Sequence, residues 1–133
     1  MSEYYSINEF LEIVAENSKA PDKKVGCVAF KDNQPVSVGW NLCADVDDDS
    51  TVTDIGRTKE ETLHAEEVMI LNSIKLGVDI RECVVYLTHS PCKHCASMLH
   101  YVGVKEVYYL KEFKKSDGIS YLERNGVVCK VLE

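Results

Sequence analysis

No stretch of this sequence is apolar over the roughly 20 residues that a membrane-spanning helix requires. The apolar stretch typical of a secretory signal peptide, internal repeats and low-complexity linkers are also absent. These absences argue against a membrane protein, a secreted protein and a repeat protein. We expect one domain over residues 1–133, without a membrane partner, in the reducing cytoplasm, where the six cysteines stay available as thiols.

Basic residues are scarce relative to acidic ones. The chain has 15 Lys and Arg against 22 Asp and Glu, which gives a formal net charge of −7 at pH 7. This charge repels a polyanion unless the positive side chains are concentrated locally. We therefore expect no long nucleic acid as a partner.

Metal-binding side chains gather in two short segments, His64-Ala65-Glu66 and Pro91-Cys92-Lys93-His94-Cys95. One imidazole and two thiolates suit zinc, which takes nitrogen and sulfur ligands in a tetrahedron. Three protein ligands leave the fourth position to water or substrate, as in a catalytic site. We therefore expect Zn²⁺ to be held by His64, Cys92 and Cys95.

The spacing of these ligands places them at helix starts. Cys92 and Cys95 lie three apart, which puts both sulfurs on one helix face, and Pro91 suits the first turn. The positive end of the helix dipole there favours thiolate over thiol. His64 precedes a second helical pattern that stops at Gly77. Two helix starts that face each other would close the site.

Glu66 is the predicted catalytic residue. It lies two positions beyond His64 and need not be a ligand. Water on zinc has its pKa lowered to about 7, and a nearby carboxylate can take its proton during attack on a ring carbon. The same carboxyl can then return the proton to the ring nitrogen and the departing amine. The pairing of H-x-E with P-C-x-x-C resembles the signature of the zinc-dependent base deaminases.

A structural zinc site is the alternative interpretation of these motifs. A fourth protein ligand would then come from His94, Cys83 or His89. Structural sites commonly show two close pairs of ligands, whereas His64 stands alone beside a glutamate. This difference favours the catalytic interpretation.

Hydrophobic periodicity predicts an α/β fold with the element order α-β-β-α-β-α-β-α-β. The early strand pair is joined by a short turn and must be antiparallel, whereas the later alternation of strands and helices calls for parallel pairing. We expect a three-layer α/β/α sandwich with a five-stranded mixed sheet. The predicted helices cover residues 7–18, 64–76, 91–103 and 116–124, and the predicted strands cover residues 25–30, 35–40, 83–88, 105–110 and 127–132.

Residues 43–62 lack this periodicity and are predicted to form a loop. Their acidic cluster is typical of a solvated surface, and a divalent-cation site or a substrate lid is the alternative. The cluster consists of Asp45, Asp47, Asp48 and Asp49.

The motifs stand in an order that resembles the cytidine deaminase superfamily, and within it the deoxycytidylate deaminases. The resemblance implies a cytidine deaminase-like fold, one catalytic zinc, a homo-oligomer, and hydrolysis of dCMP to dUMP plus ammonia. It also implies a contact between Asn41 and the sugar. Beside the two zinc motifs, the segments that carry it are Ser18-Lys19-Ala20-Pro21, Lys24-Val25-Gly26, Val38-Gly39-Trp40-Asn41, Tyr86-Leu87-Thr88 and Gly103-Val104-Lys105-Glu106-Val107-Tyr108-Tyr109.

Substrate contacts are predicted at the borders of the motifs. Ala65 and Ser90 can hydrogen-bond a pyrimidine through their backbones. An asparagine at a strand end, such as Asn41, is in general more typical of a turn or cap. A substrate phosphate needs a compensating cation. By position, the candidate cations are Lys19, Lys24 and Lys75.

Zinc-dependent deamination of a free cytosine nucleotide, with dCMP as the substrate, is therefore the expected function. Two alternatives stay open: deamination of a nucleoside or a tRNA base on the same fold, and a non-catalytic zinc-stabilised module that binds nucleotides. The segment Gly39-Trp40-Asn41 is also similar to the tRNA adenosine deaminases, although their task favours a basic surface. Tyr101 and Val102 are candidates for a contact between subunits.

Overall fold

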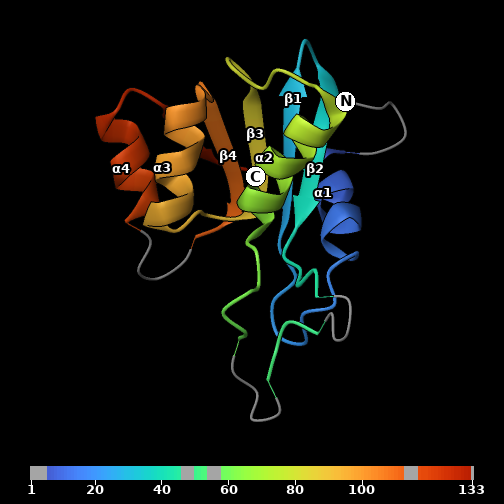
Figure 1. Ribbon diagram of the computed structural model, residues 1–133. Helices are drawn as coiled ribbons and strands as arrows, with labels where there is room; N and C mark the ends of the chain where they lie inside the picture. Colours follow the sequence, from blue (N-terminus) through green and yellow to red (C-terminus); the bar gives the residue numbers. More distant parts are fainter. Residues whose placement is uncertain (1–5, 46–49, 54–57, 113–116, 133) are drawn as a thin grey trace.

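The computed structural model describes residues 6–45, 50–53, 58–112 and 117–132, and within them five strands form one mixed sheet beside four helices (Figure 1). The α/β prediction and the predicted element order are confirmed. The helices are α1 (Ile7–Ala15), α2 (Ala65–Leu76), α3 (Lys93–Val102) and α4 (Gly118–Arg124). The strands are β1 (Gly26–Lys31), β2 (Gln34–Trp40), β3 (Val84–His89), β4 (Glu106–Lys111) and β5 (Val128–Val131).

The sheet has the strand order β2-β1-β3-β4-β5. β1 pairs antiparallel with both β2 and β3, whereas β3, β4 and β5 are parallel and are connected through α3 and α4. At the turn of the β1–β2 hairpin, Asp32 and Asn33 have φ angles of 53° and 63°. Asp and Asn tolerate this left-handed conformation better than most residues, and it matches the twist of the strands. The predicted hairpin is therefore confirmed.

Helices cover both faces of the sheet, as the three-layer prediction requires (Figure 1). On one face, Leu11 and Val14 of α1 pack with Val28 and Phe30 of β1. The other face carries α2, α3 and α4, whose buried side chains form a larger cluster with alternate residues of β1, β3 and β4. Side chains alternate between the two faces of a pleated sheet, so successive residues of a strand face opposite helix layers.

The start of α1 follows the predicted capping box. Ser6 Oγ accepts a hydrogen bond from Glu9 N at 3.1 Å, and the Glu9 carboxylate accepts from Ser6 N at 3.5 Å. The helix ends at Ala15, earlier than the predicted Ser18. The amides of Asn17 and Ser18 bond to carbonyls three residues back instead of four, so the chain leaves the α-helix in a tighter turn.

The connection between β2 and α2 is irregular, as predicted, in the part that the structure describes. Two isolated bridges hold it, Leu42 with Leu63 and Val52 with Thr58. Of the acidic cluster, only Asp45 lies among the described residues, so the prediction for the other three aspartates falls outside them. None of the described helices is long and apolar enough to cross a bilayer.

α2 lies against β2 at very short range. A side chain at Gly39 would collide with the backbone at Ala65 O and Met69 N. Ser37 Oγ donates to Met69 O at 2.7 Å, and Asn72 Nδ2 donates to Val38 O at 2.8 Å. The absent side chain and these two hydrogen bonds fix the start of α2 over the sheet.

We predict that Gly39→Ala lowers the free energy of unfolding by about 3 kcal/mol, the upper part of the usual range for overpacking, because a backbone cannot move aside as a flexible side chain can. Chemical denaturation measures the change. Gln34→Ala, at an exposed position of the same strand, should stay within about 0.5 kcal/mol of the native value. Equal stability of the two variants would contradict the proposed close packing.

Candidate metal centre and pocket

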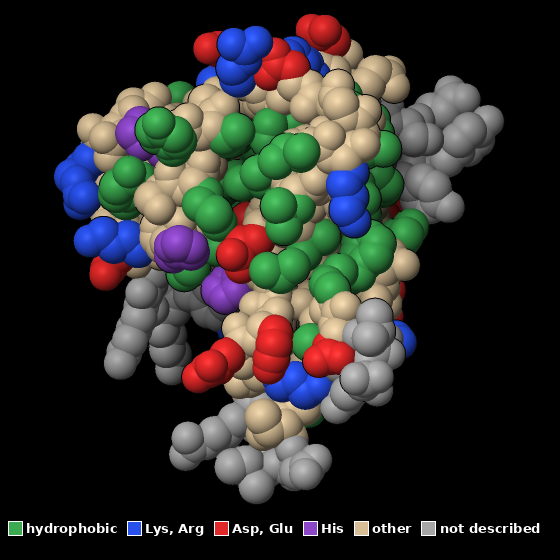
Figure 2. Space-filling model, viewed as in Figure 1, with side chains coloured by type: hydrophobic (Ala, Val, Ile, Leu, Met, Phe, Trp, Pro, Cys, Tyr) green, Lys and Arg blue, Asp and Glu red, His purple; other side chains and the backbone are tan. Residues whose placement is uncertain are grey.

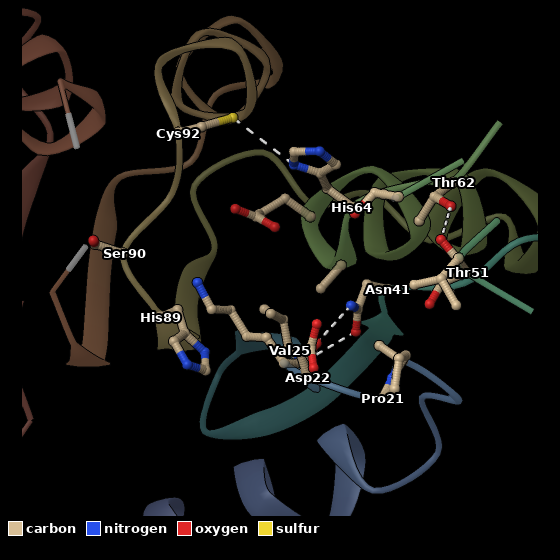
Figure 3. A pocket seen from close by; sticks show the side chains of 16 residues that line it. Pro21, Asp22, Val25, Asn41, Thr51, Thr62, His64, His89, Ser90 and Cys92 are labelled. Carbon is tan, nitrogen blue, oxygen red and sulfur yellow. Dashed lines mark hydrogen bonds between the residues drawn. The ribbon is translucent and has the colours of Figure 1, made fainter. Parts of the chain in front are cut away.

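The three predicted zinc ligands meet between the starts of α2 and α3. Figure 3 shows two of them, His64 and Cys92. His64 is the N-cap of α2, Cys92 is the N-cap of α3, and Cys95 lies in the first turn of α3. His64 Nδ1 is 3.8 Å from Cys92 Sγ and 3.3 Å from Cys95 Sγ. The predicted arrangement of two facing helix starts is thus present.

The triad fits a zinc ion. Zinc bonds of about 2.0 Å to nitrogen and about 2.3 Å to sulfur, at a tetrahedral angle, separate the two donor atoms by about 3.5 Å. The two measured separations lie on either side of this value. All three candidate ligand atoms lie within 4.8 Å of one another.

A fourth protein ligand is not found among the described residues, since the metal-binding group there consists of the triad alone. His94 is exposed to solvent on α3, and Cys83 is buried in the core of the larger cluster. His89 contacts Thr88 Oγ1 through Nδ1 at 2.8 Å. The described structure therefore gives no support to the structural-site interpretation.

The pKa values of the two cysteine thiols are shifted in opposite directions when no metal is bound. The hydrogen bond with Cys95, followed by that with His64, lowers the pKa of Cys92 to about 3. The same bond raises the pKa of Cys95 far above its usual range, because it favours the protonated Cys95 thiol. Cys92 also accepts a bond from Cys95 N at 3.5 Å. A metal that binds both sulfurs must displace the Cys95 proton.

Glu66 lies in the first turn of α2 beside the triad and outside the group of ligands. Its side chain is buried, with 4% of the residue exposed. Burial raises the pKa of the carboxyl to about 7, against the opposing effects of its own backbone N–H and of His64. A carboxyl with a pKa near neutrality can both accept and donate a proton at physiological pH.

A cavity of about 460 Å³ opens beside the triad (Figure 3). This volume is in the range of small-molecule sites. Four segments build its wall: the loop before β1, the end of β2 with the following connection, the start of α2, and the end of β3 with the start of α3. The lining residues are Ala20, Pro21, Asp22, Lys23, Val25, Asn41, Thr51, Val52, Thr58, Thr62, His64, Ala65, Glu66, His89, Ser90 and Cys92.

All three predicted substrate-binding residues line this cavity. Asn41 already bonds to the neighbouring loop, since its Oδ1 accepts from Val25 N and its Nδ2 donates to Lys23 O, both at 2.9 Å. The amide thus shapes the pocket wall, in agreement with the turn or cap role typical of such an asparagine.

Ala65 and Ser90, the two backbone contacts predicted for the pyrimidine, differ in their hydrogen-bonding groups. Ala65 is the first residue of α2, where backbone N–H groups lack intrahelical acceptors. Ser90 is buried, and its N–H donates to Lys111 O at 2.8 Å. Its carbonyl and hydroxyl oxygens, not its N–H, are the groups suited to a ligand.

The candidate phosphate cations Lys19, Lys24 and Lys75 are absent from the lining of the cavity. Lys24 pairs with Glu16 at 3.5 Å instead. The cavity lining instead includes Lys23 and the imidazole of His89, neither of which was predicted from the sequence to meet a phosphate. Their positions in the sequence were the available signal. Lys23 follows the turn at Pro21, and His89 ends the strand before the cysteine motif.

A second group that sequence reasoning missed is the set of threonines from the β2–α2 connection. Thr51 is buried, and its carbonyl accepts from Lys59 N at 3.0 Å and from Thr62 Oγ1 at 3.3 Å. Figure 3 shows Thr51 and Thr62 on the side of the pocket opposite His89 and Ser90. No periodic pattern marks these residues in the sequence.

Comparisons with known proteins agree with this geometry. Residues 2–111 match the family model described as the cytidine and deoxycytidylate deaminase zinc-binding region. The crystal structure of dCMP deaminase from the cyanophage S-TIM5 in complex with dCMP and dUMP is similar, with a TM-score of 0.89 and 29% sequence identity over 99% of both chains.

Two curated relatives are also similar in sequence. An uncharacterized deaminase of Aliivibrio fischeri is 39% identical over 75% of this chain and 67% of its own length. The deoxycytidylate deaminase of Homo sapiens is 32% identical over 83% of this chain and 64% of its own length. The chain therefore spans about two thirds of the length of these relatives.

We predict that the purified chain binds about one zinc ion and that His64→Ala binds less than a tenth as much, because two sulfurs alone hold the ion poorly. Elemental analysis after dialysis measures the metal content. His94→Ala changes an exposed histidine in the cysteine motif and should keep the native metal content. Full zinc binding by His64→Ala, or loss of zinc in His94→Ala, would refute the assignment of the triad.

Proposed function

Since this chain belongs to the cytidine and deoxycytidylate deaminase family, we propose that it is a zinc-dependent hydrolase that converts dCMP to dUMP and ammonia. The observation that carries the proposal is the buried Glu66 carboxyl beside a three-ligand metal site at the cavity. The similar cyanophage enzyme, whose structure holds dCMP and dUMP, supports the choice of substrate.

The reaction replaces the amino group of cytosine by oxygen. The oxygen of a water molecule bonds to ring carbon C4, the bond from C4 to the exocyclic nitrogen breaks, and that nitrogen leaves as ammonia. Zinc, when bound, supplies Lewis acidity that makes water nucleophilic near neutral pH. His64, Cys92 and Cys95 would hold the ion and leave one position of a tetrahedron to a non-protein ligand.

Glu66 moves the protons in this proposal. Its carboxylate accepts a proton from the attacking water and delivers it to ring nitrogen N3, and a second transfer goes to the departing amine. Burial, which raises the pKa of this carboxyl to about 7, suits both directions of transfer. The position of Glu66 in the first turn of α2, next to His64, keeps it close to the reacting atoms.

We propose that backbone groups orient the base and that Asn41 contacts the sugar. The N–H of Ala65 can donate to the pyrimidine carbonyl, and the carbonyl of Ser90 can accept from the amino group. The side-chain amide of Asn41 has one further hydrogen and one further lone pair beyond its two bonds to the loop.

The cellular setting is part of the proposal. The net charge of −7 supports a small pyrimidine nucleotide as the partner in preference to long nucleic acid. We place the chain in the cytoplasm and in pyrimidine nucleotide metabolism, where dCMP and dUMP occur.

We propose a homo-oligomer as well. Tyr101 on α3 is 93% exposed, and Leu71 and Ile74 on α2 are 46% and 70% exposed. Figure 2 shows apolar side chains gathered over this part of the molecule. Contiguous exposed apolar surface of this kind is typical of subunit contacts.

Glu66→Gln should keep the zinc content and the thermal unfolding midpoint while turnover of dCMP falls by about 10²–10⁴-fold, because the amide cannot accept the proton. Initial rates of ammonia release measure turnover. Glu61→Gln, an exposed acid on the preceding segment, should retain full activity. Appreciable activity of Glu66→Gln would remove this residue from the proposed role.

Substrate identity is tested by a panel of dCMP, deoxycytidine, cytosine and a tRNA anticodon stem-loop. We expect dCMP to give the highest kcat/KM of the four. A higher value for deoxycytidine or for the RNA would replace dCMP by the nucleoside or the tRNA base. If zinc-loaded protein releases ammonia from none of them, the non-catalytic module is favoured.

A further inference from the structure

The lining of the cavity includes the ammonium group of Lys23 and the imidazole of His89. They come from different segments, the loop before β1 and the end of β3. The loop at Lys23 is anchored by Asn41, which bonds to Lys23 O and to Val25 N. The backbone of Lys23 is therefore held at the cavity although its side chain is mostly exposed.

Hydrogen bonding assigns the tautomer of His89. Thr88 Oγ1 accepts a hydrogen bond from Gly26 N at 3.0 Å and lies 2.8 Å from His89 Nδ1. Thr88 is buried, so its single hydroxyl hydrogen needs a protein acceptor, and His89 Nδ1 is within reach. His89 then carries its own hydrogen on Nε2, which makes Nε2 a donor.

Two lysines, Lys23 and Lys111, place positive charge near His89 in spite of the acidic chain. Burial and then the nearby charges of Lys23 and Lys111 lower the pKa of this imidazole. The lowered pKa favours the neutral imidazole, which can still donate a hydrogen bond through its N–H. Asp22 adds one negative charge to the same wall, so Lys23 is needed to keep this wall from repelling an anion.

We propose that Lys23 and His89 bind the 5′-phosphate of the substrate and select a nucleoside 5′-monophosphate over the free nucleoside. The inference rests on the proposed function, because it takes the pyrimidine ring to lie at Glu66. An ammonium and an imidazole N–H are both suited to phosphate oxygens, and charge-assisted bonds of this kind are the strong ones. Lys24, although adjacent in sequence, pairs with Glu16 and is absent from the cavity lining.

Binding of the products separates phosphate recognition from turnover. Isothermal titration of the zinc-loaded chain gives the Kd for dUMP and for deoxyuridine, which differ only in the phosphate. We expect the native chain to prefer dUMP. Lys23→Gln and His89→Gln should each reduce this preference by about 10–100-fold, the loss of one hydrogen bond to a charged group.

Two further variants serve as controls. Lys23→Arg keeps the charge and should keep most of the preference, whereas Lys24→Gln removes a neighbouring charge and should change the preference by less than about twofold. A native chain that binds both products equally, or binds neither, overturns the proposed phosphate site. An undiminished preference in both Lys23→Gln and His89→Gln overturns it as well.

Turnover of deoxycytidine distinguishes a failure of the proposed phosphate site from a failure of the proposed function. A native chain that deaminates deoxycytidine but shows no preference for dUMP is a deaminase without the phosphate site. A chain that prefers dUMP through Lys23 and His89 but releases no ammonia has the phosphate site without the proposed activity.

Discussion

The N-termini of α2 and α3 meet beside the sheet, and the positions of the metal ligands and of Glu66 follow from that meeting. Two glycines permit it, since side chains at Gly39 and Gly118 would collide with the backbone at the start of α2 and at Pro91, respectively. Each helix start therefore rests directly on another part of the chain. The convergence of the three ligand atoms within 4.8 Å depends on this contact of backbones, because a side chain moved by one ångström no longer suits a small ion.

Much of the fold and the metal-binding end of the site could be predicted from the sequence, because short-range patterns encode them. The capping box at Ser6 and the stop at Gly77 mark helix boundaries through local hydrogen bonding and backbone conformation. The spacing of Cys92 and Cys95 fixes two sulfurs on one helix face. Only the approach of His64 to these cysteines is a long-range feature, and the chemistry of zinc predicts it.

The remaining pocket could not be predicted, because it is assembled from segments far apart in the sequence. Several lysines precede β1, and no local pattern distinguishes Lys23, on the cavity wall, from Lys24, which pairs with Glu16. The tautomer of His89 depends on Gly26, a residue of another strand, through Thr88. The end of α1 at Ala15 similarly reflects tertiary bonds, including Ser18 Oγ to Asn41 O at 2.8 Å.

The cavity wall is divided between rigid and irregular parts of the chain. The candidate metal ligands and Glu66 lie at the starts of two helices. Thr51, Val52 and Thr62 come from a connection that isolated bridges and single hydrogen bonds hold in the described residues. Loops accept substitutions and insertions more readily than packed helices do. Substitutions in this connection can therefore change which molecule enters the cavity while the two helix starts stay in place, so selection can alter specificity separately from the candidate metal centre.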